Sequence, residues 1–383
     1  MPDKSILIVD ADNVSLNYLT RIVKEQRYSV EGVGLGKEGL ISAWRDRPDL
    51  IIFDPALQDI SPEEFLLKLR RDARSSMIPI LALSSDPNPG TKNACLRAGC
   101  NEYVLKSSEV VATLSEFISH LLNEKQEVSK ESGYLIVFLS AKGGTGTSSL
   151  CANYAMSMHH NKPEAKVVVV DMVLPLGSIA PIVGYQGEVN LVSVSELPSN
   201  EATGEYFHRH LPELEPWRFQ LLAGAPDPER ANDLQVGRIP EIITALQKSY
   251  DFIVVDLGRS LSRISLPIIQ KADLLVLIMS TDQSTISLTK KILDYLQAQG
   301  VDSKNIYAIL NRAIGLEGLT KAEAEKIIDL PVKTALPYMG GNFALANNLN
   351  QPIILKYPED TAAIVLRENA KDMIKTATDL RGM

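Results

Sequence analysis

Short apolar runs alternate with stretches of helical periodicity along the whole chain. In about the first 120 residues, helical patterns such as 14–25 and 62–70 separate five apolar runs of strand length. These runs lie at 5–9, 28–33, 50–53, 80–83 and 102–105. Such alternation is typical of βαβ units and a mainly parallel sheet. Five strands and five helices at this length predict one small doubly wound α/β domain.

A second series of βα units follows a change in composition. Residues 123–133 are polar, charged and nearly free of large apolar side chains, which predicts a linker. We therefore expect an N-terminal domain over 1–122 and a C-terminal α/β domain over 134–383. Residues 184–230 have weak periodicity and stay unassigned. The apolar runs of the second series lie at 135–139, 166–170, 252–255, 274–279 and 305–310.

The composition is that of an acidic globular protein. Hydrophobic residues make up 45% and charged residues 22% of the 383 residues, and the formal net charge is −8. The field of an acidic protein does not attract DNA or anionic lipid, so either partner would need a local basic patch. The sequence has no dense run of Lys and Arg. We therefore expect no nucleic acid as a partner and at most peripheral contact with a membrane.

The cysteines and the length of the apolar runs favour a cytoplasmic protein. Cys95, Cys100 and Cys151 show neither CxxC spacing nor a nearby histidine cluster. That pattern predicts reduced, mostly buried thiols rather than a zinc site or a disulfide framework. The N-terminal residues lack the pattern of a signal peptide, and the longest apolar runs have only strand length.

A glycine-rich loop joins the first strand of the C-terminal domain to a helical pattern. Glycines allow a tight turn that aims several backbone N–H groups at one anion, at the positive end of a helix. The order strand, loop, helix favours phosphate binding over an ordinary glycine-rich βα turn. The loop residues that would form this cradle are Lys142, Gly143, Gly144, Thr145, Gly146, Thr147, Ser148 and Ser149.

This loop resembles the deviant Walker A motif of the ParA/MinD superfamily. The resemblance implies ATP and Mg²⁺ as ligands. In that family the first lysine, here Lys142, reaches across a sandwich homodimer to the phosphates of the other subunit. Ser148 would place its hydroxyl on Mg²⁺, and Ser149 would lie near the α-phosphate. The positions that match the motif are Lys142, Gly143, Gly144, Gly146, Ser148 and Ser149.

Two positions depart from the superfamily pattern. Thr147 replaces the second lysine, which contacts the β- and γ-phosphates in its own subunit. In the segment that resembles switch I, Asp171 matches the first acid, but Val173 replaces the second, which helps to position the attacking water. Losing one charged contact is expected to cost about 2–4 kcal/mol in the transition state. With Lys142 and Asp171 as the remaining catalytic residues, we expect ATP binding with weak or absent hydrolysis.

Other parts of the nucleotide site match the superfamily. Asp256 ends an apolar strand in the Walker B pattern and, by resemblance, would hold Mg²⁺ through water; the simpler interpretation is a helix cap. Asn311 and Arg312 resemble the strand end at which the Asn amide reads the adenine edge, against a plain turn-forming Asn. Pro337 lies in the segment that resembles the other wall of the base site.

The N-terminal domain resembles the receiver domain of response regulators, which has a flavodoxin-like fold. Receivers bind Mg²⁺ with an adjacent pair of acids plus the phospho-acceptor, because hard cations require many oxygen ligands. Here the second acid is Ala11, and Asp12 falls one residue late. We favour a pseudo-receiver used for dimerisation or docking over phosphorylation at Asp54. The residues that match receiver motifs are Asp10, Asp54, Ser84 and Lys106.

The domain order and the lysine-to-threonine change together resemble the TadZ/CpaE family of tight-adherence (Flp-type) pilus assembly. The resemblance implies a nucleotide-clamped homodimer at a cell pole that recruits the pilus secretion machinery or a polar hub. Two alternatives stay open: an active positioning ATPase of the MinD/ParA type, and a signalling adaptor gated by phosphorylation at Asp54.

A membrane-cycling ATPase of that type would need a basic amphipathic C-terminal helix. The last helical pattern, 361–379, carries acidic as well as basic residues. We expect its apolar face to pack in the core rather than on a membrane. That face consists of Ile364, Val365, Met373 and Ile374.

Overall fold

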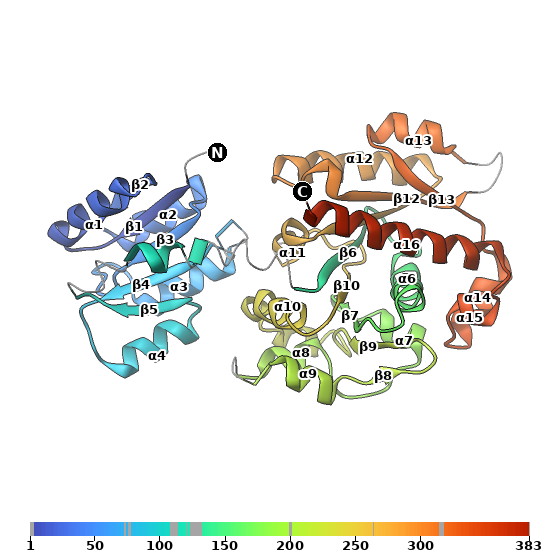
Figure 1. The fold of residues 1–383 in the computed structure, drawn as a ribbon, viewed down its shortest axis with the longest axis horizontal. Helices are drawn as coiled ribbons and strands as arrows, with labels where there is room; N and C mark the ends of the chain where they lie inside the picture. The colour runs from blue at the N-terminus through green and yellow to red at the C-terminus, as the bar shows by residue number, and fades with distance from the viewer. Residues whose placement is uncertain are drawn as a thin grey trace. The chain divides into compact units, whose positions relative to one another are not determined.

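The computed structural model divides the chain into two compact units, Met1–Ser129 and Lys130–Met383, each with its own sheet (Figure 1). Most of the predicted linker, 123–133, lies outside the described residues. The described residues are 4–72, 74–75, 78–107, 114–119, 121–122, 132–198, 201–262, 264–313 and 318–382.

The N-terminal unit is a doubly wound sheet of five parallel strands in the order β2-β1-β3-β4-β5. The strands are β1 (Ser5–Val9), β2 (Ser29–Val33), β3 (Leu50–Phe53), β4 (Ile80–Ser84) and β5 (Glu102–Leu105). The helices are α1 (Asn13–Glu25), α2 (Gly36–Asp46), α3 (Pro62–Arg71) and α4 (Pro89–Arg97), and residues 114–119 and 121–122 are also helical.

Both faces of this sheet are buried, which explains why its central strands are continuous apolar runs. One face packs against α2 and α3 through residues such as Leu7 and Phe53. The other packs against α1 and against residues 114–119 and 121–122, through residues such as Ile6 and Ile52. All five strands lie where the sequence predicts them, to within one residue at either end.

The C-terminal unit holds an eight-stranded sheet in the order β13-β12-β11-β6-β10-β7-β9-β8, in which β8 alone is antiparallel to its neighbour. The five predicted strands are present, whereas β8, β9 and β13 were missed. The strands are β6 (Tyr134–Ser140), β7 (Val167–Asp171), β8 (Glu213–Leu214), β9 (Phe219–Leu222), β10 (Phe252–Asp256), β11 (Leu274–Ser280), β12 (Ile306–Ala313) and β13 (Val332–Pro337).

Helices cover both faces of this sheet. On one face α6 and α16 pack together, and α6 is buried from Leu150 to Met158. The other face is covered by α8 to α13. The helices are α6 (Thr147–Asn161), α7 (Ile179–Val183), α8 (Leu191–Glu196), α9 (Gly204–His210), α10 (Ile239–Gln247), α11 (Ser265–Lys271), α12 (Gln283–Ala298), α13 (Lys321–Ile328), α14 (Gly340–Asn348), α15 (Ile353–Lys356) and α16 (Thr361–Gly382).

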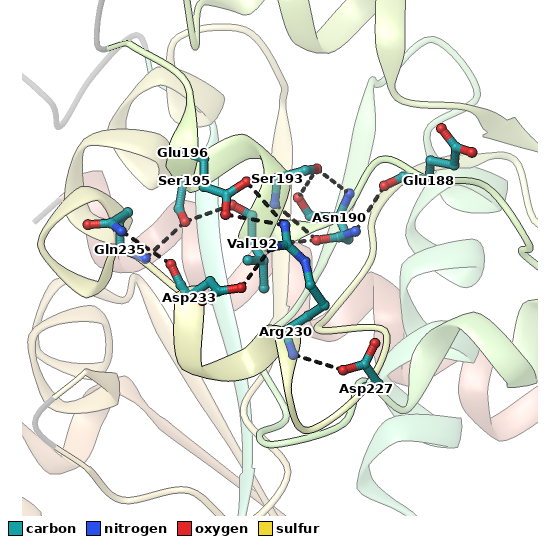
Figure 2. A network of polar contacts seen from close by, with 10 residues as sticks. All are labelled: Glu188, Asn190, Val192, Ser193, Ser195, Glu196, Asp227, Arg230, Asp233 and Gln235. Carbon is teal, nitrogen blue, oxygen red and sulfur yellow. Dashed lines mark hydrogen bonds and ion pairs between the residues drawn. The ribbon is translucent and has the colours of Figure 1, made fainter.

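The segment 184–230, which the sequence left unassigned, is built from short elements held by polar contacts (Figure 2). Asn190 and Ser193 form a capping box at the start of α8. At the other end of the segment, Arg230 pairs with Glu196 at 3.1 Å and with Asp233 at 2.7 Å. Helices this short give little periodic signal, because they span at most about two turns.

The apolar face predicted for the last helix is only partly correct. Met373 and Ile374 are buried and Val365 is partly buried, but Ile364 is 43% exposed. The buried stripe of α16 instead runs through Ala363, Leu366, Ala370, Met373 and Ala377, which face α6. In the described parts of the chain, no helix combines the length and hydrophobicity that crossing a bilayer requires.

The last turn of α16 is tied to the first residues of the C-terminal unit. Arg381 forms two hydrogen bonds of 2.6 Å to the carboxylate of Asp273. Its guanidinium also donates to the carbonyls of Ser132 and Gly133 and lies 4.0 Å from the ring centroid of Tyr134. Both charged side chains are largely buried, with 10% and 14% exposure.

Candidate functional site

The loop between β6 and α6 has the backbone of a phosphate cradle. Gly144 and Gly146 have φ values of +79° and +86°, a region that side chains other than glycine rarely adopt. A Cβ at Gly146 would also lie 3.0 Å from Asn311 Nδ2, whereas one at Gly143 or Gly144 would meet nothing within 4 Å. The loop is therefore open on its outer side. The first N–H groups of α6 lack intrahelical partners and carry partial positive charge there.

Thr147, which stands in the place of the second lysine, points into the loop. Its side chain is 5% exposed, and its hydroxyl lies 2.9 Å from that of Thr145. The Thr145 hydroxyl in turn donates to the carbonyl of Lys142 at 3.3 Å. These contacts brace the loop from within, so the Thr147 hydroxyl does not replace a charged contact on the open side.

Lys142 lies at the surface and contacts the start of α12. Its ammonium group donates to Ser284 Oγ at 2.9 Å and to Asp282 Oδ1 at 3.3 Å. Partial burial acts to raise the pKa of Asp282, but hydrogen bonds from Ser280, Ser284 and Thr285 outweigh it and hold the pKa well below its usual range. Exposed ion pairs contribute little stability, so Lys142 can exchange this carboxylate for another anion at small cost.

Asp171 and Asp256 lie opposite each other on β7 and β10, and both are fully buried. Burial first, and then the charge of Asp256, raise the pKa of Asp171 to about 7. Asp171 accepts three backbone N–H bonds, from Val173 at 3.1 Å, Ser178 at 2.6 Å and Ile179 at 2.8 Å. The predicted catalytic acid therefore holds the turn that leads into α7.

The predicted metal ligands, Ser148 and Asp256, lie in one group of oxygen atoms. Ser148 Oγ is 2.8 Å from Ser178 Oγ, which donates to Asp256 Oδ2 at 3.4 Å. Burial raises the pKa of Asp256, while hydrogen bonds from Ser148, Gly258 and Ser178 oppose the shift. Hydroxyl and carboxylate oxygens fit Mg²⁺, which also keeps water and phosphate ligands. Over the described residues, no group of three or more His, Cys, Asp or Glu forms an all-protein metal cage.

Val173, in the place of the second switch acid, faces the turn after β10. A Cβ on Gly258, whose φ is +56°, would lie 3.1 Å from Val173 Cγ2. An isopropyl group at this position offers no oxygen to orient water.

The residues predicted to contact the base lie at the ends of β12 and β13. Asn311 is 2% exposed, donates to the carbonyl of Thr145 at 2.7 Å and accepts from Arg312 N at 2.9 Å. Arg312 is exposed, with a φ of +59°, and Pro337 ends β13, paired with Ala313. In this structure Asn311 thus supports the glycine-rich loop, and its adenine contact stays a prediction.

The receiver-motif residues of the N-terminal unit form a separate cluster at the carboxyl ends of β1, β3 and β5. Lys106 Nζ donates to Asp10 Oδ2 at 2.7 Å, to Asp54 Oδ2, and to Ser15 Oγ at 2.9 Å. Ser15, which the sequence did not single out, donates to the same Asp10 oxygen at 2.6 Å. One ammonium group thus bridges both carboxylates.

The remaining receiver positions serve local turns. Asp12 accepts from Val14 N and caps α1, so it does not supply the missing second acid. Ser84 Oγ accepts from Asp86 N at 3.0 Å, and the carbonyl of Asp86 accepts from the Tyr103 hydroxyl at 2.8 Å. The three cysteines are free and buried, as predicted.

The known proteins that resemble this chain fall into two groups, one for each unit. The model of the response regulator receiver domain matches residues 6–117. A polar-differentiation response regulator of Brucella anthropi is 26% identical over 118 residues, which are 31% of this chain and 96% of that protein. An ATP-binding protein of Methanocaldococcus jannaschii, described as uncharacterized, is 24% identical over 240 residues, 62% of this chain and 87% of that protein.

Solved structures of low sequence identity share the fold of the larger, C-terminal unit. A ParA family ATPase from Chlorobium tepidum gives a TM-score of 0.58 at 22% identity, covering 63% of this chain and 99% of that one. MinD of Pyrococcus horikoshii, a septum site-determining protein solved with Mg-ADP, gives 0.56 at 22% identity, covering 65% and 98%. The chain therefore joins a receiver-type α/β unit to a ParA/MinD-like α/β unit.

Proposed function

We propose that this chain binds ATP with Mg²⁺ in its C-terminal unit and hydrolyses it weakly or not at all. The observation that carries the proposal is the intact cradle next to a Thr147 side chain turned inward at 5% exposure. The backbone and the Ser148–Asp256 group fit a phosphate chain and its metal, while the charge and the water-orienting acid are replaced. Bound Mg²⁺ would neutralise phosphate charge there.

Two similarities support nucleotide binding. The Methanocaldococcus jannaschii protein is named as ATP-binding, and the Pyrococcus horikoshii structure contains Mg-ADP. In the proposed state Lys142 leaves Asp282 for phosphate, within a homodimer that the nucleotide holds together. Asn311, Arg312 and Pro337 would face the base.

ATP affinity and turnover of the full chain test this proposal, with Thr147→Lys as the informative variant. A lysine adds a charge-assisted contact, so we expect ATP to bind roughly tenfold more tightly. Turnover is expected to stay at the level of a Lys142→Ala control, because Val173 still cannot orient water. Thr147→Met matches the length of lysine without its charge and is expected to give no gain.

Two results would contradict the proposal. Absence of ATP binding by the unmodified chain at millimolar Mg-ATP removes the nucleotide clamp. Fast hydrolysis by the unmodified chain, well above Lys142→Ala, would make it an active positioning ATPase instead.

We further propose that the nucleotide-bound homodimer is a localisation scaffold for tight-adherence pilus assembly at a cell pole. The support is the order of the two units together with Thr147 in the loop, which resemble the TadZ/CpaE family. A fluorescent fusion is expected to form a polar focus, and deletion is expected to abolish pili. Normal pili without the chain would exclude this role and leave nucleotide binding unaffected.

A further inference from the structure

The candidate phosphate site lacks a cation inside its cradle, because Thr147 stands in the place of the second lysine. Bound Mg²⁺ neutralises only part of the charge of a nucleotide phosphate chain, and side-chain cations normally add to it. The loops and strand ends around the cradle, which the structure describes throughout, bring three cationic side chains to the site. They are Lys142, Arg259 and Arg312, from residues 140–149, 171–178, 256–260, 280–285 and 311–313.

Arg259 is the cation of this set that has no other partner and no role assigned so far. Lys142 is paired with Asp282, and Arg312 lies in the segment predicted to contact the base. Arg259 is exposed and, within the part of the chain that the structure describes, forms neither a hydrogen bond nor an ion pair. It does not pair even with the buried Asp256, three residues earlier. Its charge is therefore available to a ligand.

The backbone places Arg259 beside the start of the glycine-rich loop. Strand β10 pairs in parallel with β6, and just past the end of β10 the backbone N–H of Ser140 donates to the carbonyl of Gly258 at 2.8 Å. The Ser140 hydroxyl oxygen lies 3.0 Å from the same carbonyl oxygen and 3.1 Å from the carbonyl oxygen of Lys142. The peptide group that joins Gly258 to Arg259 is therefore bonded to the first residues of the cradle.

The same turn lies at the end of the site where the terminal phosphate would be. The backbone N–H of Gly258 donates to Asp256 Oδ1 at 2.8 Å, so the turn is fixed to a candidate metal ligand. In phosphoryl-transfer sites the metal bridges the last two phosphates, and the residue that positions water lies beyond them. Val173 stands in the place of that residue, and a Cβ on Gly258 would lie 3.1 Å from Val173 Cγ2. Arg259 thus follows a turn between the metal ligand and the position of the attacking water.

We propose that Arg259 binds the terminal phosphate of the nucleotide and supplies the charge that Thr147 does not. This inference rests on the proposed nucleotide binding. A guanidinium can donate two parallel hydrogen bonds to one phosphate group, which suits it to this contact. The cation then comes from the turn after β10 instead of from helix α6. Arg259 adds affinity for the phosphate chain, but it does not provide the oxygen ligand for water that Val173 lacks.

The first test compares the affinities of the full chain for Mg-ATP and Mg-ADP. Arg259→Gln keeps a long polar side chain without the charge, and it is expected to bind Mg-ATP about 10- to 100-fold more weakly, the range for one hydrogen bond to a charged group. Its affinity for Mg-ADP is expected to change by less than about threefold, because ADP lacks the terminal phosphate. Lys248→Ala removes an exposed cation before the opposite end of β10 and is expected to change neither affinity.

The second test asks whether Arg259 and a lysine at position 147 replace each other. Two cations that contact the same phosphate oxygens are not independent, so their effects on affinity are not additive. Thr147→Lys is therefore expected to raise Mg-ATP affinity at least about threefold more in the Arg259→Gln chain than in the unmodified chain. Thr147→Met, which has the length of lysine without its charge, is expected to give no gain in either chain.

Three results would overturn this inference and leave the proposed function in place. The first is an equal loss of ATP and ADP affinity in Arg259→Gln, which would mean that Arg259 only supports the fold of the site. The second is a loss of ATP affinity no larger than that of Lys248→Ala. The third is an equal gain from Thr147→Lys in both chains. If the unmodified chain binds neither ATP nor ADP at millimolar concentration, the proposed function itself fails, and Arg259 has no nucleotide to bind.

Discussion

At the scale of single residues, the pair Asp171 and Asp256 places two carboxylates next to each other inside the protein. Both carboxylates are fully buried on neighbouring strands, and burial together with the neighbouring charge raises the pKa of Asp171 to about 7. In an unfolded chain an aspartate has a pKa near ~3.9. Between about pH 4 and pH 7, the folded state is therefore expected to hold a proton that the unfolded state releases. This group adds stability that is fully present below the unfolded pKa and is lost as the pH rises through the folded pKa.

The C-terminal unit without metal or nucleotide is therefore expected to lose thermal stability as the pH rises from about 4 to about 7. Asp256→Asn removes the neighbouring charge and is expected to flatten this dependence. Unfolding temperatures in EDTA across that pH range check it, with the exposed Glu359→Gln as control. A unit equally stable at both limits, or one that gains stability, would show that the pair is ionised throughout.

At the scale of elements, the loop between β6 and α6 depends on glycine at particular positions. Gly146 combines a left-handed backbone with a close approach to Asn311, whereas Gly143 has neither constraint. A residue with a Cβ in the left-handed region costs about 1–2 kcal/mol. The loop conformation is therefore fixed by a few backbone angles rather than by bulky packing.

Gly146→Ala is expected to destabilise the C-terminal unit by about 1–2 kcal/mol and to weaken ATP binding. Gly143→Ala, on the open side of the same loop, is expected to leave the free energy of unfolding nearly unchanged. Urea unfolding of both variants measures the difference. Equal destabilisation would mean that the two positions are under the same backbone constraint.

How much of each element the sequence predicts depends on whether its signal is local. The five strands of the N-terminal unit and the five central strands of the other are apolar runs between turns, so they were found. The two-residue β8 carries too little pattern, and β13, at the sheet edge, alternates too weakly. The short helix α8 is defined by its capping box rather than by periodicity.

The residues of the candidate sites also differ in whether a local sequence signal predicts them. Glycines in a loop and acids after apolar strands are local signals, so the sequence indicated the cradle and Asp256. Ser15, Ser178 and Asp282 come to these sites only through tertiary folding, since nothing in their immediate sequence marks them. Ser15, for example, reaches Asp10 only because helix α1 brings its hydroxyl to the end of β1.

At the scale of the whole molecule, each unit carries one cluster of charged groups at the carboxyl ends of its strands. In the N-terminal unit Lys106 forms ion pairs with both Asp10 and Asp54. In the C-terminal unit Asp171 and Asp256 have hydroxyl and amide partners instead. The first cluster thus contains a cationic side chain and the second contains none among the contacts described, although both sheets are mainly parallel.

The Arg381 contacts join distant parts of the C-terminal unit and are expected to be costly to remove. Arg381→Ala leaves Asp273 buried without its cation, a change worth about 3 kcal/mol. We expect faster hydrogen exchange both in the last turn of α16 and in the first residues of β6. Lys375→Ala, at an exposed position of the same helix, is the control. Exchange that rises at only one of the two segments would contradict the coupling.

The same contacts place the entry and the exit of the C-terminal unit beside each other in space. Because Arg381 reaches the carbonyls of Ser132 and Gly133, a short peptide could connect residue 382 to residue 132 without crossing the fold. The first and the last described residues of the unit are therefore close in space. A circular permutant with new ends in an exposed loop would keep every strand in its present place.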